Sequence, residues 1–325
     1  MLGCPAGRAL AAGWLVRAQS HPNVGERGVS ALDLARLQFA TTTIYHFLFV
    51  PITIGLAFVV AGFETAYVRT GNETWLRLTK FFGRLFLINF AIGVATGIVQ
   101  EFQFGMNWSS YSRFVGDIFG APLAMEGLAA FALESTFIGL WVFGWNRMRK
   151  GVHASMMWLT AIGTVMSAYF ILAANSWMQH PVGYRISETT GRPTLDNIFP
   201  VLFQPLVLLL FGHTLLAATI TAGTVVLAVS AWQLLKRANV EVFAKVAGIA
   251  LAVLLVVSPV QLLVGHQLGL EAIRDQPIKM AAGGRCGRPR PRHPSPLSRS
   301  AAGRWTISSR SSPSMSRTFF RCSTL

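Results

Sequence analysis

Two histidines lie within long apolar stretches of the sequence. His46 follows Thr43-Ile-Tyr, and His213 follows Leu210-Phe-Gly. An imidazole in an apolar helix is suited to bind haem iron, because one ring nitrogen can bind the metal while the other makes a local hydrogen bond. A neutral histidine packed against a backbone carbonyl would give the same pattern. Spacing alone leaves both interpretations open.

Two glutamates, Glu126 and Glu134, interrupt another apolar stretch. Ionisable groups inside a membrane span are costly, so each is a functional hypothesis. In a regular α-helix the two residues lie about 12 Å apart along the axis and about 80° apart around it. Together with the hydroxyl of Ser167, they have the composition of a proton route. The alternative is a carboxylate pair that binds an ion or neutralises a partner helix.

The elements that carry these residues are membrane spans. Of the 325 residues, 52% are hydrophobic and 13% are charged, whereas soluble domains have about 25% charged residues. A short amphipathic helix over residues 31–39 leads into the first span. Six apolar stretches are long enough to cross a bilayer: 42–66, 85–104, 122–145, 156–178, 203–232 and 246–266. The predicted fold class is an all-α polytopic membrane helix bundle with six transmembrane helices.

The loops between the predicted spans differ in charge. Three alternate loops hold ten basic residues, and the other two hold only Arg113, Arg185 and Arg192. Because basic loops remain in the cytoplasm, the N-terminus is predicted to lie outside. The chain after the sixth span is predicted to begin outside as well.

Small and aromatic residues complete the pattern of the spans. Gly93 and Gly97 form a Gly-x-x-x-Gly motif, which allows close approach of another helix or a flat cofactor. Glu101 is expected at the outer interface. The tryptophans near the span ends are interpreted as interfacial anchors: Trp108, Trp141, Trp145, Trp158 and Trp177.

The terminal segments have a different composition. The net charge of +15 is concentrated from Gly283 to Leu325, a segment with nine Arg and no Asp, Glu or Lys. Such an Arg-, Ser- and Pro-rich segment cannot bury a core and is expected to be disordered. Cys4, Cys286 and Cys322 all lie in terminal segments, which argues against a disulfide framework, a zinc site or thiol chemistry.

Six motifs between residues 31 and 282 are long and specific. They are Arg36-Leu-Gln-Phe-Ala, Tyr45-His-Phe-Leu-Phe-Val-Pro, Gly93-Val-Ala-Thr-Gly, Glu101-Phe-Gln-Phe-Gly-Met-Asn-Trp, Gly116-Asp-Ile-Phe-Gly-Ala-Pro-Leu-Ala-Met-Glu-Gly and Leu133-Glu-Ser-Thr-Phe. Over this range the chain resembles subunit I of the cytochrome bd-type quinol oxidases. The resemblance implies a nine-span fold, of which six spans are present here, in the bacterial cytoplasmic (inner) membrane.

The resemblance also implies three haem cofactors. His46 matches the axial ligand of a high-spin haem in the oxygen-reducing pair, which contains haem b and haem d. His213 matches a ligand of the low-spin haem b that receives electrons from quinol. Which high-spin haem His46 binds is left open, because family members differ.

Further roles follow from the same resemblance. Glu126 and Glu134 match acids of proton delivery and of the haem surroundings, and Ser167 lies on the same route. Lys279 matches a basic residue at the start of the outer quinol loop. Such an enzyme oxidises quinol outside, reduces oxygen to water with cytoplasmic protons, and has a second large subunit and a small accessory subunit as partners. Lipid is expected around the spans, and nucleic acid is not expected as a partner.

The sequence departs from the family after Lys279. The methionine ligand of low-spin haem b, a glutamate of the high-spin pair, a Gly-Arg-Gln-Pro-Trp motif and the quinol-loop glutamate are missing. We therefore expect a frameshifted or truncated record, and no turnover from the chain as written.

Three domains are predicted on this basis. Residues 1–29 are an N-terminal extension that precedes the true start. Residues 30–282 are the haem-binding oxidase domain, with the outer loop beginning near 267. Residues 283–325 are an out-of-frame tail, with an arm that binds anionic lipid as the alternative.

Two other function classes remain open at this point. One is a non-catalytic remnant of an oxidase subunit. The other is a multi-pass ion or proton transporter that uses Glu126 and Glu134, although it gives no role to His46 and His213.

Overall fold

The computed structural model describes residues 30–283. Six helices are long and apolar enough to cross a membrane, which confirms the predicted number of spans. Five of them are continuous: α1 (Ala31–Thr70), α2 (Glu73–Gly105), α5 (Lys150–Gln179), α7 (Pro205–Leu235) and α8 (Val240–Asp275). The remaining span consists of α3 (Ser109–Met125), a π-helical turn η1 (Glu126–Phe131) and α4 (Ala132–Phe143). The predicted extension and nearly all of the predicted tail lie outside the described residues.

The helices are longer than the apolar stretches that predicted them, because polar caps and not apolar residues set their ends. The side chain of Asn72 accepts from the backbone N–H of Thr74 at 2.9 Å and caps α2, as asparagine commonly does. Pro205 occupies the first turn of α7, where a missing N–H costs nothing. The predicted short helix over residues 31–39 is continuous with α1 and is not a separate element.

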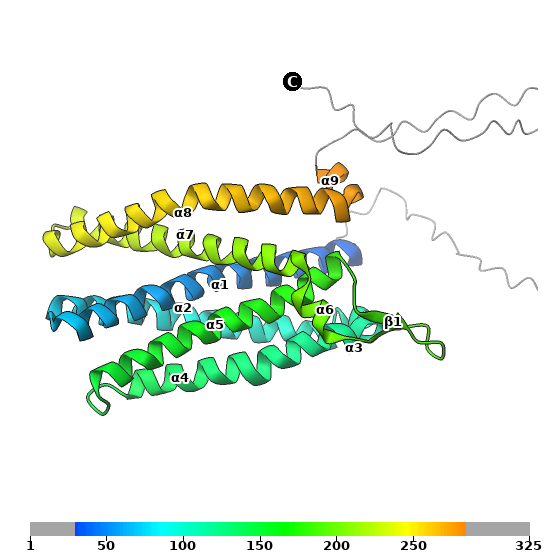
Figure 1. The fold of residues 1–325 in the computed structure, drawn as a ribbon, viewed down its shortest axis with the longest axis horizontal. Coiled ribbons are helices and arrows are strands. Elements are labelled where there is room, and N and C mark those ends of the chain that lie inside the picture. The colour runs from blue at the N-terminus through cyan, green and yellow to red at the C-terminus, as the bar shows by residue number, and fades with distance from the viewer. Residues whose placement is uncertain (1–29, 284–325) are drawn as a thin grey trace, which may run out of the picture. The chain divides into compact units, whose positions relative to one another are not determined.

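The chain divides into two compact units, Met1–Thr41 and Thr42–Leu325. The described part of the first unit is residues 30–41, which form the beginning of α1. In the second unit the long helices run along a common direction, with α7 beside α8 and α4 beside α5 (Figure 1).

Short elements connect or follow the helices at one end of this unit. The strands β1 (Tyr184–Ile186) and β2 (Pro193–Leu195) form an antiparallel hairpin between α5 and α6 (Ile198–Phe203). The seven-residue helix α9 (Pro277–Gly283) follows α8. All of these elements lie at the end that the loop charges predict to be outside.

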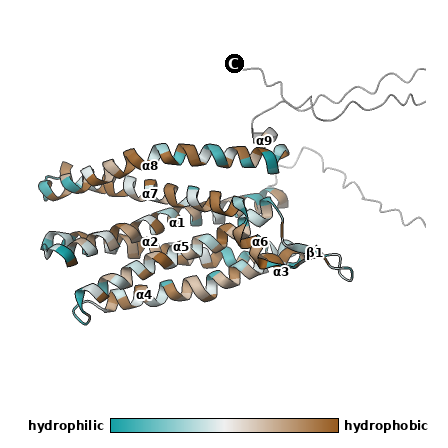
Figure 2. Cartoon of the chain, viewed as in Figure 1, coloured by the Kyte–Doolittle hydropathy of each residue, from teal (hydrophilic) through white to brown (hydrophobic). Residues whose placement is uncertain are grey.

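The largest buried core occupies the other half of the bundle, and two smaller buried clusters lie at the end that carries the hairpin and α6. Buried residues of α1 lie within 53–67, those of α8 within 243–250, and those of α2 mainly within 78–86. These segments adjoin the basic loops. Hydrophobic residues nevertheless continue along the helices, and hydrophilic residues gather toward the helix ends (Figure 2). Exposed apolar residues such as Leu262 and Leu263 on α8 fit a surface that faces lipid or another subunit.

Candidate functional site

His46 is held by a hydrogen bond to the neighbouring helix. Its Nδ1 atom lies 3.0 Å from the hydroxyl oxygen of Thr96 on α2. That hydroxyl lies 2.9 Å from the carbonyl oxygens of Ile92 and Gly93, to which its hydrogen is donated, so its oxygen accepts from the imidazole. Nδ1 therefore carries the proton, and the lone pair of the neutral ring is on Nε2. Histidines that bind metals commonly donate their other ring N–H in this way.

A glycine leaves room for the edge of this ring. A Cβ atom built on Gly97 would lie 3.0 Å from Cε1 of His46, which is too close without a shift. A Cβ atom on Gly93 would lie 3.6 Å from its nearest neighbour, the Cβ of Phe49. The two glycines of the Gly-x-x-x-Gly motif thus differ, and Gly97 is the one that the imidazole requires.

His213 on α7 faces two residues that are one turn apart on α8. The amide nitrogen Nε2 of Gln261 lies 3.2 Å from both ring nitrogens of His213. A Cβ atom on Gly265 would lie 3.4 Å from Cε1 of the ring. An atom at the same distance from both ring nitrogens lies over the face of the imidazole and not along either nitrogen lone pair. The Gln261 amide therefore packs on the ring of His213 and leaves its in-plane lone pair available to iron.

The same amide has an unsatisfied group. Oε1 of Gln261 is buried and has no hydrogen-bond partner among the described residues. An unsatisfied buried acceptor costs free energy, so the Gln261 amide is not held by a full set of hydrogen bonds. Both histidines fit iron ligation, because each ring keeps an in-plane nitrogen lone pair that no described residue occupies.

Glu126 and Ser167 are in direct contact. Oγ of Ser167 on α5 donates to Oε1 of Glu126 at 2.7 Å. Glu126 also begins the π-helical turn η1, so the angle of about 80° calculated for a regular α-helix is wrong here. A π-turn changes the direction of every following side chain, and such turns are frequent at functional sites.

Glu134 is buried on α4, with 6% of its surface exposed. A Cβ atom on Gly163 would lie 3.0 Å from the Cβ of Glu134, so α4 and α5 are in close contact at this level. Within residues 30–283, no hydrogen bond joins Glu134 to Glu126 or Ser167. A proton can pass between these groups only through water or another side chain.

Lys279 lies apart from the other candidates, on α9. Its Nζ atom is 3.4 Å from Oε1 of Gln179, the last residue of α5. The side chain of Gln276 donates to the backbone carbonyl of Gln179 at 2.9 Å. These contacts fix the start of α9 to the end of α5.

Sequence reasoning missed a buried polar cluster of three residues. Glu64 on α1, Trp141 on α4 and His153 on α5 are hydrogen-bonded to one another and are each less than 5% exposed. The signal for Glu64 was present, since it is an ionisable residue inside the first predicted span. His153 precedes the fourth predicted span and was therefore counted with the loop.

The cluster also corrects the interpretation of the tryptophans. Trp141 and Trp177 are 2% and 5% exposed, so they are not interfacial anchors. The indole nitrogen of Trp141 donates to Glu64, and that of Trp177 donates to the backbone carbonyl of Val182. Aromatic residues near span ends are anchors only when their rings face the interface.

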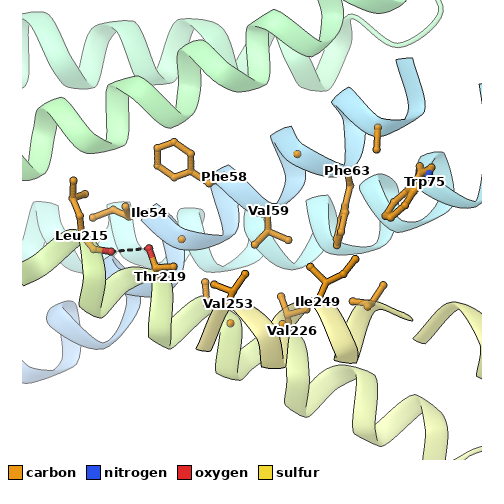
Figure 3. Close-up of a pocket in the computed structure, with 17 residues that line it drawn as sticks. Ile54, Phe58, Val59, Phe63, Trp75, Leu215, Thr219, Val226, Ile249 and Val253 are labelled. Atoms are coloured by element: carbon orange, nitrogen blue, oxygen red, sulfur yellow. Dashed lines mark hydrogen bonds between the residues drawn. The ribbon is translucent and has the colours of Figure 1, made fainter. Parts of the chain in front are cut away.

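A cavity of about 550 Å³ lies between α1, α7 and α8. Figure 3 shows apolar side chains from these helices around it, including Phe58, Val226 and Ile249. The hydroxyl of Thr219 donates to the carbonyl of Leu215 in its own helix, and the lining has no titratable side chain. The apolar lining of this cavity therefore suits a hydrocarbon.

The fold and the site define a class of protein: an all-α membrane bundle with histidines suited to bind metal and with buried carboxyl groups. A family model for subunit I of cytochrome bd terminal oxidases matches residues 34–294. The chain belongs to this family. Its members are haem-containing oxidoreductases of respiratory electron transport, embedded in the membrane.

Curated relatives agree with this assignment. The chain is 50% identical over 254 residues to cytochrome bd ubiquinol oxidase subunit 1 of Bacillus subtilis (strain 168), covering 78% of this chain and 54% of the relative. It is 47% identical over 253 residues to cytochrome bd-II ubiquinol oxidase subunit 1 of Escherichia coli (strain K12), covering 77% of this chain and 49% of the relative. The chain thus spans about half the length of these relatives.

A solved structure has the same fold. The bd oxidase from Geobacillus thermodenitrificans superposes with a TM-score of 0.72 at 26% identity, covering 79% of this chain and 59% of the other.

Proposed function

We propose that this chain forms the haem-binding and proton-conducting part of subunit I of a quinol-oxidising terminal oxidase. In this proposal, quinol is oxidised at the outer face of the bacterial cytoplasmic membrane. Oxygen is reduced to water with protons from the cytoplasm. The observation that carries the proposal is the contact of 3.0 Å between Nδ1 of His46 and the hydroxyl of Thr96, which favours the tautomer with the lone pair on Nε2.

His46 and His213 are the proposed iron ligands. His46 takes a high-spin haem, of type b or d, and His213 takes the low-spin haem b. When bound, these haems transfer electrons from quinol and activate oxygen. Thr96 holds the proton of His46 on Nδ1, and Gly97 leaves space for the ring edge. The amide of Gln261 packs against the ring of His213 and would hold its orientation toward the iron.

Protons and quinol are handled by other side chains. The hydroxyl of Ser167 orients the carboxyl group of Glu126. The carboxyl group of Glu134 on α4 is the proposed second group that binds and releases a proton. Lys279 is proposed to act in quinol oxidation at the outer end of α5 and α8. Residues 30–282 are the proposed oxidase domain, with subunit II and a small accessory subunit as partners.

Haem content tests this proposal in the full chain, purified from membranes. We expect His46→Ala and His213→Ala each to lower the haem bound per chain, measured as the pyridine haemochromogen. The matched control is His266→Ala, an exposed histidine on α8, which should leave haem content unchanged. Equal haem in all variants would refute the ligand assignment. No haem in the unaltered chain would favour a remnant or an ion transporter that uses Glu126 and Glu134.

A further inference from the structure

The buried cluster of Glu64, Trp141 and His153 joins three helices. Nε1 of Trp141 donates to Oε2 of Glu64 at 2.7 Å. Oε1 of Glu64 is hydrogen-bonded to Nδ1 of His153. Nε2 of His153 lies 2.9 Å from the backbone carbonyl oxygen of Trp141. Every polar atom of the two ionisable side chains thus has a partner inside the protein.

These contacts define the number of protons in the cluster. A carbonyl oxygen only accepts, so Nε2 of His153 carries a hydrogen. One further proton then lies between Nδ1 of His153 and Oε1 of Glu64. Whether it resides on the imidazole or on the carboxyl group, the net charge of the pair is zero. A buried charge without a partner would be strongly destabilised, so this neutral state with one shared proton is the resting state.

His153, the member of the Glu64–His153 pair that lies on α5, is at the start of a polar face of that helix. Thr160, Thr164 and Ser167 follow His153 at intervals of seven, four and three residues. At 100° per residue, all four side chains fall within a sector of about 60°. Thr160 and Thr164 are buried, and their hydroxyls donate to carbonyls of their own helix, which leaves their lone pairs able to accept.

This face leads to the proton-carrying groups of the candidate site. His153 and Ser167 are about 21 Å apart along the helix axis, and Ser167 donates to Glu126. Glu134 packs against α5 between them, at Gly163. Three hydroxyl groups of α5, two of them buried, and the buried carboxyl group of Glu134 on α4 therefore lie between the cluster and Glu126.

The surroundings of the pair are aromatic and basic. The ring of Trp145 lies 4.2 Å from the ring of His153, between centroids. Nζ of Lys80 lies 5.2 Å above Trp145, and Nζ of Lys150 lies 4.6 Å above Tyr67. These lysines belong to the loops that are predicted to face the cytoplasm. The pair is thus covered by aromatic rings at the side from which an oxidase takes its protons.

We propose that Glu64 and His153 form the proton-holding pair at the cytoplasmic end of the route to Glu126. This inference rests on the proposed oxidase function. The pair takes one proton from cytoplasmic water and passes one proton towards Glu134 and Ser167, so only N–H and O–H bonds form and break. The indole of Trp141 positions the carboxyl group of Glu64 and carries no proton in transit.

The first test uses turnover of an oxidase complex whose subunit I contains these residues and continues through the remaining spans of the family. We expect Glu64→Gln and His153→Gln to slow quinol-driven oxygen consumption by about tenfold or more, with unchanged haem content. The matched control is Trp141→Phe, which removes a donor to Glu64 but leaves both proton carriers, and it should retain most of the activity. Normal rates and pH profiles in both Gln variants would overturn the proposal and leave the cluster as a structural contact between helices.

The second test does not depend on haem or turnover. The full chain in lipid vesicles is monitored by infrared difference spectroscopy while the pH is changed only on the side of the basic loops. We expect carboxyl and imidazole bands that respond within seconds and are lost in both Gln variants. Bands that respond only to a pH change on the opposite side, or not at all, would refute the pair as the cytoplasmic proton acceptor. If the unaltered chain binds no haem but shows the expected bands, the proposed oxidase function is refuted and the proton-holding pair is not.

Discussion

At the scale of single residues, the two candidate haem ligands differ in their partners. The hydroxyl of Thr96 fixes the tautomer of His46, because an acceptor on Nδ1 leaves the lone pair on Nε2. The amide of Gln261 lies at 3.2 Å from both ring nitrogens of His213 and packs against the ring. Both histidines could be chosen from the sequence as ionisable residues in apolar stretches. Their partners are 50 and 48 residues away, and no local pattern indicates them.

A glycine-to-alanine pair tests the geometry at His46. In Gly97→Ala, the new methyl group would lie 3.0 Å from Cε1 of the ring, so the imidazole must move. We expect at least half of the high-spin haem to be lost, measured from the optical spectrum of the purified chain. Gly93→Ala adds the same methyl group at an ordinary contact distance of 3.6 Å and should retain the haem. Equal spectra for the two variants would contradict the assignment of His46 as a ligand.

At the scale of elements, apolar length and hydropathy predicted all six spans, because a helix that crosses lipid must satisfy its own backbone hydrogen bonds. The π-turn at Glu126–Phe131 was not predictable from these patterns. Its hydrogen bonds differ from those of an α-helix by one residue, and neither hydropathy nor helix propensity records that difference. The angle calculated for a regular α-helix therefore does not apply between Glu126 and Glu134.

The contact between α1 and α7 provides a test of helix packing. A Cβ atom on Gly55 would overlap the side chain of Ala222 and lie 2.5 Å from the carbonyl oxygen of Ala218. We expect Gly55→Ala to destabilise the chain by about 1–3 kcal/mol, because the helices cannot approach as closely. The control is Gly62→Ala on the same helix, where no atom lies within 4 Å. It should be neutral or gain up to about 1 kcal/mol from helix propensity.

Thermal unfolding in detergent measures both effects. A melting temperature for Gly55→Ala at or above that of Gly62→Ala would show that α1 and α7 are not packed through Gly55.

At the scale of the whole molecule, the two halves of the bundle differ in packing and in chemistry. The half next to the basic loops contains the largest apolar core and the pair of Glu64 and His153. The other half contains His46 and His213, and there α1 and α8 bury few side chains. In that half these two helices leave apolar surface that faces lipid or another subunit.

Membrane orientation is the prediction that belongs to this scale. In a chain whose three cysteines are replaced by serine, Thr189→Cys should react with an impermeant maleimide in intact cells. Thr189 follows β1 in the hairpin at the end predicted to be outside, and it is exposed. Glu241→Cys, at the start of α8, should react only in inverted membrane vesicles. The opposite labelling pattern would contradict the orientation predicted from loop charge.

The sequence by itself determined the class of fold, the six spans, the two histidines and the pair of glutamates. These depend on the composition of single segments, which the cost of burying charge in lipid makes recognisable. Only the tertiary structure decided which groups meet: Ser167 with Glu126, Thr96 with His46, and His153 with Glu64. The last of these contacts joins residues 89 positions apart. Such pairings depend on how the helices pack against one another, and that packing sets their rotation and depth.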